Sequence, residues 1–159
     1  MSALEDALQI MRDVTPLKTD CGVLCGCACC HGEQDDGMIL LPHESARYRE
    51  ADWCRVIRRD GMDVLVCCGS CPRDMRPFSC MLFPLRISVK DSSVRIIMDP
   101  LAVPVCPLTD HGLRALDSAF LSAAKHSAGI LLKDPEYLSF FREQTKRMET
   151  GLDSPLFTL

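Results

Sequence analysis

Cysteines are the residues of this chain whose type and spacing point most directly to chemistry. The sequence has 11 cysteines, in two dense groups and at the two single positions 54 and 106. The first group is Cys21, Cys25, Cys27, Cys29 and Cys30. The second group is Cys67, Cys68, Cys71 and Cys80. Such crowding has three explanations: disulfide bonds, a metal or iron–sulfur site, or a reactive thiol with spare neighbours.

Disulfide bonds are the least favoured of the three. An odd number of cysteines leaves at least one thiol unpaired. The chain opens with MSALEDALQIMRD, which is amphipathic and acidic rather than basic and then apolar, so we expect no signal peptide. No apolar run is long enough to span a membrane. We therefore expect a cytoplasmic protein, in which thiols stay reduced and available as ligands.

The spacing of the cysteines favours metal ligation. Closely spaced ligands close on one site with little loss of loop entropy, and the glycines beside them let the backbone approach a sulfur. We predict that the ligands come from this set: Cys21, Cys25, Cys29, Cys30, Cys67 or Cys68, Cys71, Cys80 and Cys106. These eight thiolates suffice for two sites of four or for one site with spare cysteines, and they suit either zinc or a [4Fe–4S] cluster.

Other side chains near the cysteines are weighed as supporting groups. Four thiolates around Zn²⁺ or a [4Fe–4S]²⁺ core leave a net charge of about −2, which neighbouring cations stabilise. Three arginines lie close to the second group in the sequence: Arg73, Arg76 and Arg86. For Arg86, a position that faces solvent is as consistent with the sequence as a position that supports the site. We expect Cys27 and Cys54 to be bystanders, and the cysteines suffice without His31 as a ligand.

Composition and motifs argue against several other functions. The net charge of −4 disfavours a nucleic-acid partner, because neutralising phosphates requires a basic surface. The sequence has no phosphate-binding glycine loop, no nucleophile elbow and no helical His-Glu-x-x-His motif. No catalytic residue is therefore assigned.

The elements expected to position the cysteines begin with a helix and continue as short strands. Ser2 and Glu5 form a capping box for an opening helix. The dipeptide Asp60-Gly61 predicts a hairpin over residues 54–68, since such a pair adopts the positive φ angles of a tight turn. A second hairpin is predicted over residues 85–99, with its turn at 91–93 and Val94 on its apolar face.

The last third of the chain predicts two helices. Apolar residues from Leu113 to Ala124 keep helical spacing, with Gly129 interrupting rather than ending the pattern. Asp134 and Pro135 are typical of the start of another helix. We therefore predict a small α+β protein of one domain, with an N-terminal helix (1–19), a cysteine-rich metal-binding core with short β-hairpins (20–108) and C-terminal helices (109–159).

Three stretches of the sequence resemble a known family. They are DCGVLCGCACCHGEQDDGMILLPHE (20–44), CCGSCPRDMRPFSCMLFPL (67–85) and MDPLAVPVCPL (98–108). In this order they are similar to the bacterial and archaeal cysteine-rich family described as zinc- or iron-chelating (YkgJ-type, CxxCxxCC), whose cysteine pattern also occurs in flagellin lysine N-methylase. The resemblance covers roughly residues 20–108, although Met81 stands where family members often have arginine.

The resemblance implies a metal site more directly than a reaction. It implies Cys21, Cys25, Cys29 and Cys30 as the first four ligands, then Cys80, then Cys106. We expect a protein that holds zinc or an iron–sulfur cluster, with electron transfer or service to a modifying enzyme as its role and a redox or modifying enzyme as its partner. The alternatives are a structural zinc module without redox activity and a methyltransferase-related enzyme.

Overall fold

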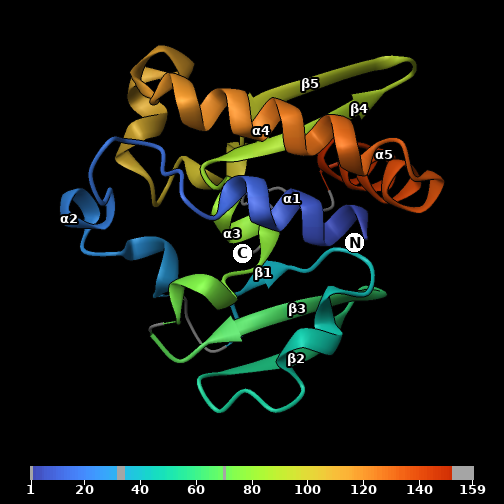
Figure 1. The fold of residues 1–159 in the computed structure, drawn as a ribbon, viewed down its shortest axis with the longest axis horizontal. Coiled ribbons are helices and arrows are strands. Elements are labelled where there is room, and N and C mark those ends of the chain that lie inside the picture. The colour runs from blue at the N-terminus through green and yellow to red at the C-terminus, as the bar shows by residue number, and fades with distance from the viewer. Residues whose placement is uncertain (1, 32–34, 70, 152–159) are drawn as a thin grey trace.

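The structure is a computed structural model that describes residues 2–31, 35–69 and 71–151 (Figure 1). It combines helices with antiparallel strands, and it has a helix at the N-terminal end and two helices in the C-terminal third, so the predicted α+β class is confirmed. The α-helices are α1 (Ala3–Met11), α2 (Gly22–Cys25), α3 (Phe78–Leu82), α4 (Ser118–Leu131) and α5 (Pro135–Glu149). Short 3₁₀ helices connect many of these elements, among them Ala28–Cys30 and Glu44–Tyr48.

The strands form two small sheets. The first has the order β1-β3-β2, from β1 (Met38–Ile39), β2 (Cys54–Arg59) and β3 (Met62–Cys67). The second is the hairpin of β4 (Leu85–Lys90) and β5 (Ser93–Met98). Figure 1 shows the first sheet below α1 and the hairpin β4–β5 above α4.

Both predicted hairpins are present, and their turns have the expected backbone. Asp60 and Gly61 have φ angles of 51° and 81°, the left-handed conformations that a two-residue hairpin turn requires. In the second hairpin Asp91 has a φ of 52°, while Ser93 already belongs to β5 rather than to the turn. Both predicted turns thus lie within one residue of the observed ones.

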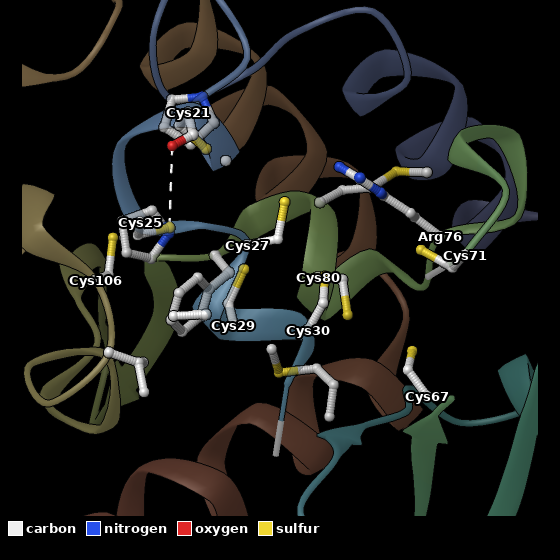
Figure 2. Close-up of a pocket in the computed structure, with 18 of the residues that line it drawn as sticks. Cys21, Cys25, Cys27, Cys29, Cys30, Cys67, Cys71, Arg76, Cys80 and Cys106 are labelled. Atoms are coloured by element: carbon white, nitrogen blue, oxygen red, sulfur yellow. Dashed lines mark hydrogen bonds between the residues drawn. The ribbon is translucent and has the colours of Figure 1, made fainter. Parts of the chain in front are cut away.

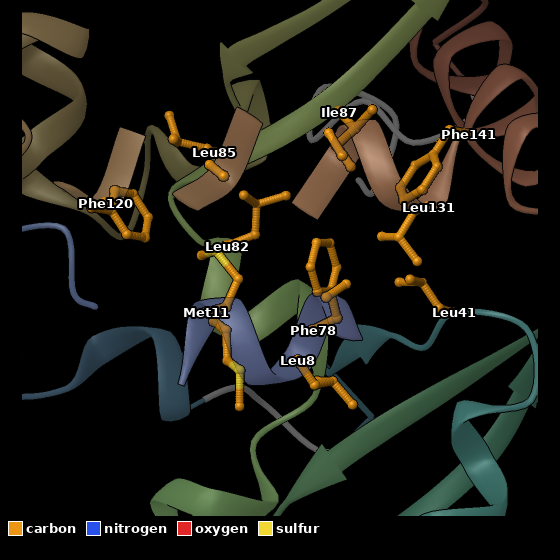
Figure 3. Close-up of a cluster of buried hydrophobic side chains, with 14 of the residues drawn as sticks. Leu8, Met11, Leu41, Phe78, Leu82, Leu85, Ile87, Phe120, Leu131 and Phe141 are labelled. Atoms are coloured by element: carbon orange, nitrogen blue, oxygen red, sulfur yellow. The ribbon is translucent and has the colours of Figure 1, made fainter. Parts of the chain in front are cut away.

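The main hydrophobic core lies between α1, α3, α4, α5 and β4 (Figure 3). Helix α1 packs against α3 and α4, and α5 packs against β4. Leu8, Phe78 and Phe120 meet in this core, so the N-terminal helix, the cysteine-rich segment and the C-terminal helices share it. Val94 was predicted to join the apolar face of the hairpin, but its side chain is 50% exposed because α5 covers β4 rather than β5.

The C-terminal helices are present, but the first starts later than predicted. Asp117 caps α4 by accepting hydrogen bonds from the backbone N–H groups of Ala119 and Phe120, whereas Leu113 lies in a separate 3₁₀ turn. Helix α4 continues through Gly129 to Leu131. Asp134 caps α5 as predicted. The C-terminal segment 152–159 lies outside the described residues.

None of the helices in the described part of the chain is both long enough and apolar enough to cross a membrane.

Candidate metal centre

A cavity of about 590 Å³ lies where β3, α2, α3 and the loop after β5 meet. Nine of the 11 cysteines line it (Figure 2): Cys21, Cys25, Cys27, Cys29, Cys30, Cys67, Cys71, Cys80 and Cys106. The set includes eight of the nine candidate ligands, all but Cys68, and adds Cys27. Thiols that are up to 85 residues apart in the chain therefore line the same cavity, and we call them the thiols of the cavity wall.

Local backbone geometry turns the first cysteine group toward the cavity. Cys21 precedes α2 and Cys25 ends it, with the Cys25 Sγ 4.0 Å from the Cys21 carbonyl oxygen. Gly26 and Cys27 then both have a φ of 58°, so the chain reverses before the 3₁₀ helix Ala28–Cys30. A Cβ at position 22 would lie 2.6 Å from the Cys27 Sγ, so a larger residue there would require that sulfur to move.

The end of strand β3 separates Cys67 from Cys68. Cys67 lines the cavity, whereas Cys68 is exposed and lies outside the lining residues that the structure describes. Cys67 is the last residue of β3, and Cys68 lies in the bend that follows the strand. Sequence spacing alone left this choice open, and the structure places Cys67 on the side of the other thiols.

A buried carboxylate positions the helix that carries Cys80. The Glu44 side chain is completely buried and accepts hydrogen bonds from the backbone N–H groups of Phe78 (2.7 Å) and Leu41 (2.9 Å). The hydroxyl of Ser79 donates to the Ile39 carbonyl oxygen at 2.7 Å. Both interactions attach the start of α3 to the segment around β1, so they determine where the Cys80 sulfur lies.

A hydrogen bond between the neighbouring thiols Cys29 and Cys30 shifts their pKa values in opposite directions. The bond from Cys29 stabilises the Cys30 thiolate and lowers the pKa of Cys30 to about 6, and the nearby Arg76 guanidinium acts in the same direction. The same bond raises the pKa of Cys29, and burial adds to that effect. Of the two thiols, Cys30 is therefore the one that ionises more readily.

Burial raises the pKa of the other thiols in the wall. It is the largest cause for Cys21, for Cys80 and for Cys67, whose pKa rises to about 11. Neighbouring thiols raise these values further, because two thiolates close together repel each other. Such buried thiols ionise readily only when a cation or a metal compensates their charge.

Among the described residues, Arg76 is one of four arginines that line the cavity. It is half-buried, and although burial opposes its charge, a hydrogen bond with Cys71 and the neighbouring Cys30 and Cys80 raise the pKa of Arg76. Arg73 also lines the cavity. Arg86 does not line it, but its side chain is only 13% exposed and lies 3.6 Å from Asp99, which does line the cavity, so Arg86 neither faces solvent nor lies among the thiols.

The remaining candidates have distinct positions. Cys27 is exposed, and both Cys27 and His31 line the cavity. Cys54 is buried opposite Cys67 in the β2–β3 ladder, within a separate small core that includes Tyr48. Glu44 was not identified from the sequence, because no motif marks a glutamate that becomes buried through contacts distant along the chain.

The thiols surround the cavity rather than converge on one point. All 11 cysteines lie in the described residues and are free thiols. Within the described ranges, no group of three or more His, Cys, Asp or Glu side chains is close enough to hold a single metal ion. The wall thus has the donor chemistry of a metal site without the tight geometry of a single-ion site.

Comparison with known proteins adds no relative. No family model matches the chain, and neither the search of curated proteins nor the search of solved structures gave a significant match. The resemblance to the YkgJ-type family therefore stays a prediction.

Proposed function

We propose that this protein binds an iron–sulfur cluster through the cysteine thiolates of the cavity wall. The observation that supports this most strongly is the meeting of nine cysteines, from segments far apart in the chain, around one cavity of about 590 Å³. Thiolates are the usual protein ligands of such clusters. When bound, the cluster would supply one-electron redox chemistry, while the protein would hold it and tune its charge.

The spread of the thiols favours a cluster over a single zinc ion. A structural zinc site requires four ligands at about 2.0–2.3 Å from one point. The described thiols show no such convergence; they are spread around a cavity of about 590 Å³. A cluster distributes its protein ligands over several iron atoms, which suits a wide ring of sulfurs.

A structural metal site is the second candidate, because the first cysteine group has little else to hold it. In segment 21–31, all of which is described, no residue is buried, and Cys21 alone is among the partly buried residues packed against the main hydrophobic core. Zinc at four of these thiolates would supply folding free energy, on the order of 10–16 kcal/mol for small zinc domains. In that case the metal would stabilise the loops and take no part in redox chemistry.

Positively charged side chains at the cavity would stabilise a negatively charged group bound there. Arg73 and Arg76 both line it, and Arg76 forms a hydrogen bond with Cys71. From the resemblance we further propose a redox or protein-modifying enzyme as the partner. We also propose the cytoplasm as the compartment, where thiols stay reduced and available as ligands. The net charge of −4 leads us to propose no nucleic-acid partner.

Two adjacent cysteines provide a matched test of this function. Cys67→Ser should lower the metal content per chain, because Cys67 lines the cavity. Cys68→Ser should leave the metal content unchanged, because Cys68 is exposed outside the wall. The measurement is iron, sulfide and zinc per folded chain after anaerobic purification. Equal metal loss in both variants, or loss in neither, would refute the assignment of this wall as the site.

A further inference from the structure

Cys54 and Cys67 lie directly opposite each other on neighbouring antiparallel strands. The register of β2 and β3 pairs them at the end of the ladder that is farthest from the turn. Side chains of directly opposite residues lie on the same face of a sheet. Cys54 is buried in the small core around Tyr48, and Cys67 packs against that core and also lines the cavity. The pair therefore connects a thiol outside the cavity wall to a thiol within it.

The hydrogen bonds of the sheet make this pair a closely spaced one. In antiparallel strands, pairs that exchange backbone hydrogen bonds, with Cα atoms about 5.5 Å apart, alternate with pairs that do not, whose Cα atoms are about 4.5 Å apart. The carbonyl oxygen of Asp63 accepts a hydrogen bond from Leu40 beside β1, at 2.9 Å, and so points away from β2. Asp63 and Arg58 therefore form a pair without hydrogen bonds. Cys54 and Cys67 lie four residues further along each strand, so they form a pair of the same kind.

The end of the ladder agrees with this assignment. The N–H of Cys68 donates to the carbonyl oxygen of Trp53 at 3.1 Å, as expected when the next pair is a hydrogen-bonded one. A Cα separation of about 4.5 Å lies within the range of about 4.4–6.8 Å that disulfide bonds span. The backbone thus already has the spacing that a disulfide between Cys54 and Cys67 requires.

The two thiols differ in how a small molecule can reach them. Both are free in the structure, where Cys54 is buried and Cys67 is half-buried. Cys67 lines the cavity of about 590 Å³, whereas Cys54 is not among the described residues that line it. A small molecule that enters the cavity should therefore react with Cys67 first, with the Cys54 sulfur behind it in the sheet.

We propose that Cys54 and Cys67 form a reversible redox switch, in which a disulfide between them removes Cys67 from the thiols of the cavity wall. The oxidant is a small disulfide of the glutathione type. The Cys67 thiolate attacks one sulfur of this molecule, which releases one small thiolate and leaves a mixed disulfide. The Cys54 thiolate then attacks the Cys67 sulfur and releases the second small thiolate. In total, two protein thiols lose two electrons and two protons, and the small disulfide becomes two thiols.

The effect of the switch on metal binding rests on the proposed function. A sulfur in a disulfide cannot serve as a thiolate ligand, so the oxidised chain has one donor fewer in the cavity wall. In the opposite direction, metal bound to Cys67 occupies the thiolate and prevents the disulfide. The disulfide itself requires only the geometry of β2 and β3, so it can be tested without metal.

Peptide mapping of the metal-free wild-type chain tests the switch. The reduced protein is incubated anaerobically with oxidised glutathione, the remaining thiols are alkylated, and the chain is digested with trypsin. Trypsin cleaves between the two cysteines, because Arg55, Arg58 and Arg59 lie between them. Peptide 50–55 contains Cys54 as its only cysteine, and peptide 60–73 contains Cys67. We expect the two peptides to be joined, with fragmentation placing the bond at Cys67, and to separate after reduction.

The same mapping shows which result would overturn the switch. Peptide 60–73 also contains Cys68 and Cys71, so a bond from Cys54 to either of these would contradict the proposed pairing. A Cys54 that stays free and is alkylated would do the same. Cys68→Ser is the matched variant, and it should retain the joined peptides, because Cys68 is exposed in the bend after β3. The wild-type result does not depend on whether this variant folds.

A parallel incubation separates the switch from the function. The chain is first loaded with Zn²⁺, or with ferrous iron and sulfide, and then treated with the same oxidant. We expect Cys54 to stay free, because Cys67 is ligated. A disulfide that forms equally with and without bound metal would leave the switch standing and refute Cys67 as a ligand. Absence of the disulfide even without metal would overturn the switch and leave the metal-binding function standing, whereas a chain that takes up no metal would refute only that function.

Discussion

Glu44 illustrates how one residue outside the cysteine pattern organises the site. Its carboxylate is completely buried and accepts hydrogen bonds from Phe78, 34 residues away, and from Leu41. Buried backbone N–H groups without an acceptor are costly, so this side chain connects the helix of Cys80 to the segment after β1. Burial of the carboxyl raises the pKa of Glu44, although these hydrogen bonds oppose the shift.

Removing this carboxylate should destabilise the fold. In Glu44→Ala the N–H groups of Phe78 and Leu41 lose their acceptor, so the free energy of unfolding should fall by at least about 2 kcal/mol. Glu50→Ala is the matched control, because Glu50 is exposed. Urea denaturation of the metal-free proteins measures both changes. Equal stability of the two variants would show that Glu44 does not carry this role.

The raised pKa of Glu44 also predicts a pH dependence with a definite sign. In the folded state the carboxyl holds its proton to higher pH than in the unfolded chain, where its pKa is about 4.3. Its contribution to stability is therefore fully present below pH 4.3 and decreases as the pH rises through the raised folded-state pKa. The stability difference between wild type and Glu44→Ala should be larger at pH 4 than at pH 7. A difference that increases with pH would contradict this assignment.

At the scale of elements, the close approach of β1 to β3 brings the two sides of the cavity together. Gly37 precedes β1, and a Cβ there would overlap the carbonyl oxygen of Leu65 in β3. Strand β1 has only two residues, Met38 and Ile39, so its pairing depends on this contact. Glycine at position 37 thus permits the sheet that ends in Cys67.

Two glycine-to-alanine substitutions should therefore have opposite effects. Gly37→Ala should lower the free energy of unfolding by about 1–3 kcal/mol, because the added methyl group has no room. Gly129→Ala should raise it by up to about 1 kcal/mol, because position 129 lies inside α4 with open space around it. Thermal or urea unfolding gives both values. The account of β1 fails if the two variants change stability in the same direction.

Local signals were enough to predict most of the elements. The Asp60-Gly61 turn, the capping box at Ser2 and the cap at Asp134 act within a few residues of chain, so each is visible in the sequence. Val94 could not be placed in the same way. Its exposure depends on α5 covering β4, while in β5 only Ile96 and Met98 pack against the core, and this arrangement is set by tertiary packing.

At the scale of the whole molecule, the hydrophobic core and the cysteine cavity stabilise different parts of the chain. The core unites α1, α3, β4, α4 and α5. Segment 21–31 has no buried residue among its described positions and faces the cavity instead. We therefore expect the core to fold without metal, and the first cysteine group to become ordered when metal binds.

Hydrogen exchange can test this division. Amide protons in segment 21–31 should exchange more slowly in the metal-loaded protein than in the metal-free protein, because ligation opposes local opening. Amides of α5, which packs against β4 in the core, should change little and serve as the internal control. An equal gain of protection in both segments, or a gain confined to α5, would contradict the division.

The candidate site was predictable in its chemistry but not in its full membership. Spacing and the chemistry of thiolates identified eight of the cysteines that line the cavity, including the distant Cys106. The choice between Cys67 and Cys68 required the direction of side chains at the end of β3, and the role of Glu44 required contacts made across the fold. Both features depend on contacts between segments far apart in the chain, so a local sequence pattern does not predict them.

The central claim is that the cysteine cavity holds an iron–sulfur cluster, and composition analysis tests it most directly. The wild-type protein is purified under strict exclusion of oxygen, its visible spectrum is recorded, and iron, acid-labile sulfide and zinc are measured per chain. The account predicts a brown protein with iron and sulfide in about equal amounts and little zinc. A colourless protein with stoichiometric zinc and no sulfide, or a folded protein with all 11 thiols free and no metal, would contradict it.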